Sequence, residues 1–158
     1  MTAFILGFRQ RHLPLLALLA VPSLFAQPAK PLSEIISSSE TTIKNGSTVR
    51  IDITMANQSS DIMILRSNRL GPQEAGMIVW DQNGHALSPR DGFKERPDTI
   101  HRGMGVVIRP GKSVTESVDL NKWFDLTTPG QYTVQSSRKV PGDGEMVESN
   151  KLTITITP

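Results

Sequence analysis

The sequence predicts an all-β fold of about seven or eight short strands. Strand-length apolar runs are separated by Asn-Gly and Pro-Gly turn signals at 45–46, 83–84, 110–111 and 129–130. No segment shows a sustained 3.6-residue apolar period, which argues against helices. Short strands in a domain of residues 33–158, after a Pro-containing linker at 27–32, predict an immunoglobulin-like antiparallel two-sheet sandwich.

The first 26 residues predict a signal peptide. Arg9 and Arg11 precede an apolar run from Leu13 to Phe25, and small residues follow it. The run is shorter than the roughly 20 residues that span a bilayer, so no membrane anchor is expected after cleavage near Ala26. The mature protein is therefore expected to be secreted or periplasmic, and it contains no cysteine for a disulfide.

Charge argues against a nucleic-acid partner. The chain has 17 Lys and Arg against 15 Asp and Glu, and cleavage removes Arg9 and Arg11, which leaves equal numbers. No Lys/Arg cluster is visible, whereas nucleic-acid binders carry a basic face.

The first strands are predicted from two apolar patterns. In 47–57, apolar residues at 49, 51, 53 and 55 alternate with polar ones, as in a half-buried strand. The run from Ile62 to Leu65 is continuously apolar, which is typical of a strand buried on both faces. The segment 76–89 is expected to form a hairpin around Asn83-Gly84, with a type I′ turn that needs positive φ at both residues.

The second half of the chain continues the pattern. Residues 104–120 predict two strands joined by Pro110-Gly111, one helical turn is expected at 121–124, and 131–139 and 151–157 each predict a strand. In the last, Leu152, Ile154 and Ile156 alternate with threonines.

Tyr132, the only tyrosine, is predicted to be structural. In a tyrosine corner, a Tyr near the start of the sixth sandwich strand sends its hydroxyl back to the backbone a few residues upstream. Asp125, Gly130, Tyr132 and Val134 have the expected spacing. A buried Tyr ring needs a partner for its hydroxyl, which favours this interpretation over a catalytic or binding phenol.

The turn residues and the core positions of the predicted strands resemble those of known protein families. The segments 108–134 and 147–157 resemble bacterial secreted immunoglobulin-like domains of unknown function. They are also similar to the bacterial intracellular proteinase inhibitor family and to the β-rich propeptide of deuterolysin-like metallopeptidases. The residues that carry this resemblance are Asn57, Asp81, Gly84, Pro110, Gly111, Ser113, Pro129, Gly130 and Tyr132. The resemblance covers about residues 33–157 and implies a sandwich fold.

The residues predict no enzyme, no metal site and no cofactor. The mature chain has only His85 and His101 as possible bases, and it has no Gly-x-Ser-x-Gly elbow. Gly111-Lys112-Ser113 lacks the glycine spacing and the helix of a phosphate loop. Two acidic groups, Asp91 to His101 and Asp143 with Glu145, lack known metal-ligand spacing and are interpreted as solvated loops.

The long polar stretch 88–105 is the predicted contact surface, because loops of this length tend to be functional or disordered. The candidate binding residues are Arg90, Phe93, Lys94, Arg96, His101 and Arg102. The expected partner is a protein or a cell-envelope component. The alternative is a protease inhibitor that inserts this loop into a protease. Trp80 is expected to pack in the core rather than stack on a ligand, and Trp123-Phe124 to close one end of the sandwich.

Overall fold

The computed structural model describes residues 30–67, 71–73, 75–91, 105–142 and 144–158. These residues form strands and one four-residue helix, so the predicted all-β class is confirmed. The elements are β1 (Leu32–Ser37), β2 (Thr42–Lys44), β3 (Arg50–Asn57), β4 (Met63–Arg66), β5 (Ile78–Trp80), β6 (Gly105–Ile108), β7 (Ser113–Asp119), α1 (Leu120–Trp123), β8 (Gly130–Gln135), β9 (Ser137–Lys139), β10 (Met146–Glu148) and β11 (Leu152–Thr157).

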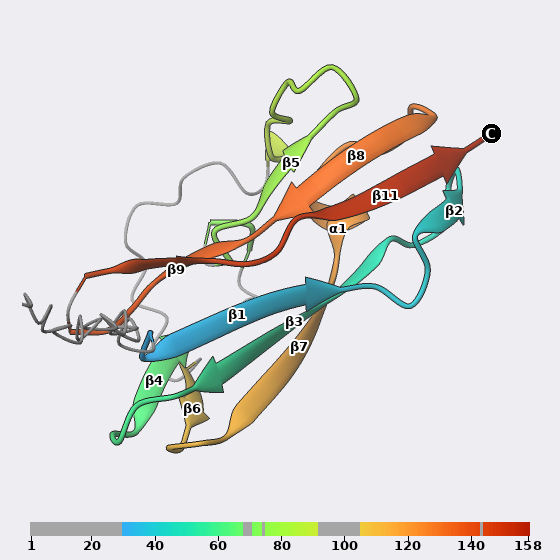
Figure 1. Ribbon diagram of the computed structural model, residues 1–158. Coiled ribbons are helices and arrows are strands. Elements are labelled where there is room, and N and C mark those ends of the chain that lie inside the picture. Colours follow the sequence, from blue (N-terminus) through green and yellow to red (C-terminus); the bar gives the residue numbers. More distant parts are fainter. Residues whose placement is uncertain (1–29, 68–70, 74, 92–104, 143) are drawn as a thin grey trace, which may run out of the picture.

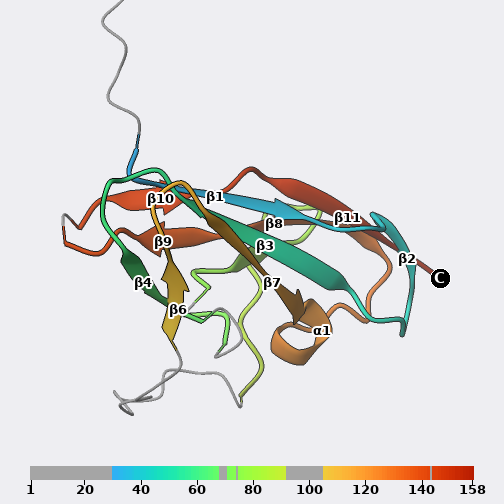
Figure 2. The same cartoon turned by 90° about the horizontal axis from the view of Figure 1, so that it is seen from below.

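Two sheets form the body of the domain (Figure 1). The first has the order β1-β3-β7, and the second has the order β2-β11-β8-β5. All their pairings are antiparallel except β2 with β11, which is parallel. Two further pairs, β4 with β6 and β9 with β10, lie toward the same end of the domain (Figure 2). The immunoglobulin type stays a prediction, and the order β5-β8-β11 agrees with the C-F-G sheet of that fold.

The core lies between the two sheets, as the alternation in β3 predicts. Ile51, Ile53 and Met55 are fully buried, while the residues between them are only half-buried. From the second sheet, Val134 and Ile154 join the same cluster. The burial of one face of each sheet against the other is the main source of stability in such folds.

The run from Ile62 to Leu65 departs from the prediction of a strand buried on both faces. Met63 and Leu65 are buried, but Ile62 and Ile64 are 60% and 64% exposed. The reason is that, within the described ranges, β4 pairs only with β6, and this ribbon turns one face to the core. Nothing among the described residues covers the other face of Ile64.

The hairpin at Asn83-Gly84 forms, but the predicted type I′ turn is wrong. Gly84 has φ +81°, whereas no non-Gly residue in the described part of the chain has positive φ. The Asp81 carboxylate instead accepts hydrogen bonds from the backbone N–H of Asn83 (2.9 Å) and of His85 (2.8 Å). These bonds favour a longer connection, which ends in a bridge between Trp80 and Ala86.

Other predicted elements are confirmed with small changes. Gly111 has φ +66° in the turn between β6 and β7, and α1 supplies the expected helical turn. The single strand predicted at 131–139 is divided into β8 and β9 by Ser136. Three short strands, β1, β2 and β10, are additional to the predicted set.

A polar seam joins the two sheets where this strand is divided. Glu148 pairs with Ser137 and Leu152 pairs with Val134, so residues 149–151 on one side lie opposite 135–136 on the other. The side with three residues has one extra residue, which is a β-bulge. The side chain of Asn150 in the bulge accepts from the N–H of Ile36 (2.9 Å) and donates to its carbonyl (3.0 Å). Beside it, Glu34 of β1 accepts from Ser136 Oγ and from Arg138 Nε (2.9 Å). The polar seam is defined here as Glu34, Ser136, Arg138, Ser149 and Asn150.

Candidate functional site

Among the predicted binding residues, the structure describes Arg90. Its N–H donates to the Trp123 carbonyl (2.7 Å), its Nε to the Phe124 carbonyl (3.1 Å), and its Nη2 lies 3.4 Å from the Asp125 carboxylate. These contacts fix the start of the 88–105 stretch to the end of α1. The other candidates, Phe93, Lys94, Arg96, His101 and Arg102, lie outside the described residues, so the loop site stays a prediction.

The described ranges contain neither a group of metal-ligating side chains nor a membrane-spanning helix. There, no three His, Asp or Glu side chains gather in a way that could hold a metal ion. Glu95, Asp98, His101 and Asp143 of the two acidic groups lie outside those ranges. No helix formed by residues 30–158, apart from the gaps named above, is long and apolar enough to cross a bilayer.

Tyr132 has the predicted structural role. Its ring is 6% exposed, and its hydroxyl donates to the backbone carbonyl of Thr128, four residues upstream, at 2.7 Å. Burial raises the pKa of the Tyr132 hydroxyl, and the negative charge of Asp125 adds to this effect. A phenol that donates to its own backbone within the core is not presented to a ligand, so the tyrosine corner is confirmed.

Trp80 contradicts the prediction that it packs in the core. Met77 and Val79 take the inward positions of the β5 segment, so Trp80, one residue on, is turned to the outer face of the second sheet and is partly exposed. The nearby Trp123 and Phe124 are buried, as predicted. The indole of Trp80 is therefore an aromatic side chain within reach of a ligand.

A surface depression of about 390 Å³ surrounds Trp80. We call it the Trp80 groove and define it by Trp80, Gln82, Gln131, Thr133, Lys151 and Thr153; Asp81 and Gly84 also line it. Trp80, Thr133 and Thr153 form one row across β5, β8 and β11, because they are partners in the strand register. The Lys151 ammonium lies 5.5 Å from the centre of the indole ring.

The polar side chains of the Trp80 groove are not used by the fold. Within the described part of the chain, the amides of Gln82 and Gln131 and the hydroxyls of Thr133 and Thr153 have no hydrogen-bond partner. The adjacent Asp81 differs, because its bonds to the backbone of His85 and Asn83 hold its carboxylate in the turn and lower its pKa.

A second surface lies on the outer side of β4 and β6, and we call it the β4–β6 face. It consists of Ile62, Ile64 and Val107, with exposures of 60%, 64% and 56%. Ile64 and Val107 are direct partners across the ribbon, so their side chains form one continuous apolar patch. Gly105 lies against Ile64: a Cβ at this glycine would come within 3.0 Å of Ile64 Cγ2.

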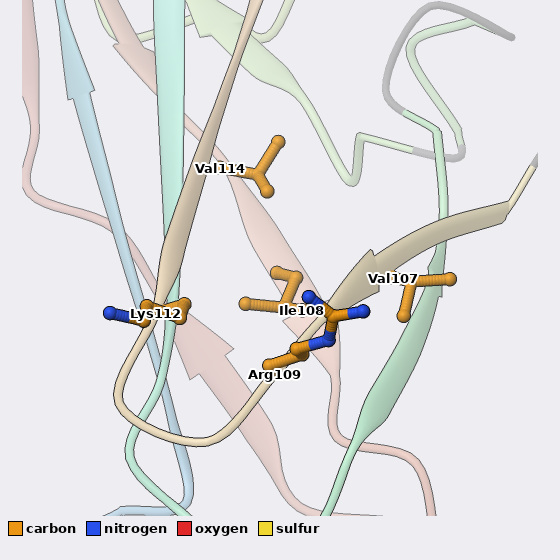
Figure 3. A pocket seen from close by; sticks show the side chains of 5 residues that line it. All are labelled: Val107, Ile108, Arg109, Lys112 and Val114. Carbon is orange, nitrogen blue, oxygen red and sulfur yellow. The ribbon is translucent and has the colours of Figure 1, made fainter.

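A depression lies beside the β4–β6 face. It has a volume of about 350 Å³ and is lined by Val107, Ile108, Arg109, Lys112 and Val114. Figure 3 shows these side chains along β6, the following turn and the start of β7. Neither the Arg109 guanidinium nor the Lys112 ammonium has an ion-pair partner in the described ranges. An apolar patch is thus bordered by two cations to which the described residues offer no ion-pair partner.

Sequence reasoning missed both surfaces for different reasons. For the β4–β6 face, the signal was the apolar run from Ile62 to Leu65. Such a run predicts a strand that is covered on both faces, whereas the described residues cover only one. The signal for the Trp80 groove was the alternation of Met77, Val79 and their neighbours, which places Trp80 outward. The size of the indole favoured a core position and outweighed it.

Comparisons with known proteins add no functional assignment. No family model and no curated protein matches the chain. The β-glucosidase from Listeria innocua in complex with gluconolactone aligns with a TM-score of 0.41 and 11% identity, over 80% of this chain and 16% of the enzyme. AvmM, which catalyses macrocyclization in alchivemycin A biosynthesis, aligns with a TM-score of 0.39 and 13% identity, over 81% of this chain and 89% of AvmM. Similarities this low support no conclusion about the function of this chain.

Proposed function

We propose that the chain is an exported, non-enzymatic binding module that docks a protein of the cell envelope on its β4–β6 face. The observation that carries the proposal is the mismatch between the sequence and the burial of this ribbon. Ile62 to Leu65 has the composition of a strand covered on both faces, yet Ile62 and Ile64 are exposed. Exposed apolar patches on soluble proteins commonly mark interaction sites.

The charges beside the patch specify the partner further. Arg109 and Lys112 lie at the depression next to Val107, and the part of the chain described here offers neither of them an ion-pair partner. A partner segment that combines apolar and acidic side chains would cover the patch and pair both cations. Charge complementarity of this kind mainly sets orientation and association rate, whereas the apolar contact supplies the affinity.

The proposed surface adjoins the loop that the sequence singles out. β6 begins at Gly105, where the 88–105 stretch ends, so a partner on the β4–β6 face is next to that loop in the chain. Export is supported by the charged and apolar pattern of residues 1–26. The protease-inhibitor alternative depends on the 88–105 loop, of which residues 92–104 lie outside the described ranges, and no contact of the described residues favours it over simple docking.

Site-specific photocrosslinking in the producing cell tests the proposal. A photoreactive phenylalanine analogue is placed at Ile64, and the matched control carries it at Ile35, which is 57% exposed on the first sheet. We expect one discrete protein adduct from position 64 and none of that size from position 35. Adding Ile62→Thr and Val107→Thr to the position 64 variant should remove the adduct while the strand propensity is kept.

Three outcomes would contradict the proposal. The first is the absence of any adduct from position 64, and the second is the same adduct pattern from both positions. An adduct with twice the mass of the mature chain would show that a second copy, rather than an envelope protein, covers the patch. High salt should weaken the authentic adduct, because the two cations contribute to association.

A further inference from the structure

We propose that the Trp80 groove is a second binding site, and that its ligand is a neutral oligosaccharide chain. This site lies on the outer face of the second sheet, on β5, β8 and β11, and it does not depend on the function proposed for the β4–β6 face. The inference rests on the kind of side chains gathered there and on what each of them is free to do.

The aromatic component is the partly exposed indole of Trp80. The C–H bonds on one face of a pyranose ring are weakly positive, and the face of an indole is negative, so the two surfaces are complementary. Because β5 fixes its backbone between β8 and the Ala86 bridge, the indole is held on a rigid element rather than on a mobile tip. Rigid placement lowers the entropic cost of binding a ligand.

The polar component consists of groups that both donate and accept hydrogen bonds. Gln82 and Gln131 present amides, and Thr133 and Thr153 present hydroxyls, and the described chain supplies a partner for none of these four side chains. Sugar hydroxyls also donate and accept, so each can pair with such a group. A ligand with charged groups would instead require charged partners. Both charged side chains that line the groove already have contacts, because the Asp81 carboxylate is held in its own turn and the Lys151 ammonium lies over the indole.

Lys151 has a separate role in the free protein. Its ammonium lies over the indole at 5.5 Å and covers the surface on which a sugar would stack. A cation–π contact at an exposed site is weak, so a sugar ring can displace the lysine without a large penalty. The displaced ammonium then remains at the edge of the groove as a hydrogen-bond donor to sugar oxygens.

Gln82 is positioned by the backbone of the neighbouring strand. Its side-chain oxygen lies so close to Gly130 that a Cβ at that residue would approach it to 3.1 Å. The glycine at 130 therefore leaves room for this amide to lie against β8, at the border of the groove.

Affinity gel electrophoresis tests the proposal. The folded mature protein is run through gels that contain one neutral polysaccharide each: a soluble β-glucan, an α-glucan, a mannan, a xylan and glycol chitin. We expect at least one of them to retard the protein, and the matching hexasaccharide to change the tryptophan fluorescence. Trp80→Ala should weaken binding at least tenfold, while Gln131→Ala should weaken it several-fold.

Matched variants separate a binding effect from a folding effect. Ile78→Ala lies on the same strand and outer face but outside the groove, and it should bind like the parent protein. Trp80→Phe keeps an aromatic face and should retain part of the affinity. Ile64→Thr, which affects only the β4–β6 face, should leave the retardation unchanged.

Two results would overturn the inference. One is the absence of retardation by every polysaccharide in the panel. The other is binding confined to an acidic polysaccharide, abolished by 0.5 M salt and by Lys151→Met but not by Trp80→Ala, because that pattern describes a simple ion-exchange surface. If Trp80→Ala does not fold, the Gln131→Ala and Thr153→Val variants decide the question.

Discussion

The polar seam and the Trp80 groove use the same kinds of side chain in opposite ways. In the seam, Glu34 and Arg138 form an ion pair with side-chain exposures of 0% and 6%, and their neighbours are all hydrogen-bonded. In the groove, amides and hydroxyls are held in place without partners in the described chain. The seam therefore contributes to the structure of the domain, and the groove has hydrogen-bonding capacity left over for a ligand.

This difference follows from burial. A polar group that is removed from water must be paired, because an unpaired one costs free energy. In the described part of the chain, no buried side-chain nitrogen or oxygen lacks a partner. Groove residues stay hydrated in the free protein, so they carry no such requirement. Substitutions in the two regions should consequently have effects of very different size.

The largest effect is expected for Arg138→Met. The change leaves the Glu34 carboxylate buried without its cation, and the free energy of unfolding should fall by roughly 3–5 kcal/mol. Urea denaturation measures this loss. Combining Glu34→Gln with Arg138→Met should recover a large part of it, and Arg50→Met, at an exposed arginine, should change stability by less than about 0.5 kcal/mol. Equal losses in the single and double variants would contradict this account of the pair.

Tyr132→Phe tests a buried hydroxyl outside the seam. Removing it leaves the Thr128 carbonyl without its donor, which should lower the free energy of unfolding by roughly 1–3 kcal/mol. Because burial raises the Tyr132 pKa, the stabilisation from the protonated phenol is complete below pH ~10 and is lost as the pH rises through the folded pKa.

The mature chain has one tyrosine, so its titration can be followed directly. The absorbance of tyrosinate near 295 nm should rise at a higher pH in the folded protein than in urea. Titration at the same pH in both states would show that the hydroxyl is not buried.

A smaller effect is expected in acid at Asp81. Its bonds to the backbone of His85 and Asn83 lower the carboxyl pKa, so the stabilisation is present above the unfolded value of about 4 and is lost as the pH falls through the folded value. Asp81→Asn should therefore flatten the dependence of thermal stability on pH below about 4. A pH dependence in Asp81→Asn equal to that of the parent would contradict the role given to these bonds.

The smallest effect on stability is expected in the groove itself. Gln131→Ala and Gln82→Ala should each change the free energy of unfolding by less than about 0.5 kcal/mol, because the described chain gives these amides no partner to lose. Urea denaturation again provides the measurement. A loss above 1 kcal/mol would place these residues with the polar seam and remove the contrast between the two regions.

The sequence predicts these regions unequally. Alternation in β3 indicates which residues are buried, and the spacing around Tyr132 indicates the tyrosine corner, because both depend on neighbours a few positions away. Periodicity shows that two faces of a strand differ, but it does not show whether another strand or layer covers the second face. That is why the exposure of Ile64 is not predicted, whereas the outward position of Trp80 follows from alternation and was missed because the size of its indole favoured the core.

The polar seam cannot be predicted from local sequence patterns, for a different reason. Glu34 and Arg138 are separated by 104 positions, and each resembles an ordinary surface charge in its own segment. The bulge at 149–151, which supplies Ser149 and Asn150 to the seam, likewise follows from the register of two strand pairs rather than from any single one. The register between strands that are far apart in the chain cannot be predicted from local patterns in a single sequence.

The position of β11 has a consequence for the order of folding. It lies between β2 and β8, so the second sheet has no continuous hydrogen-bonded path from β2 to β8 until the last residues of the strand are present. A chain emerging from the ribosome therefore cannot complete this layer before Leu152–Thr157 of β11 have been synthesised.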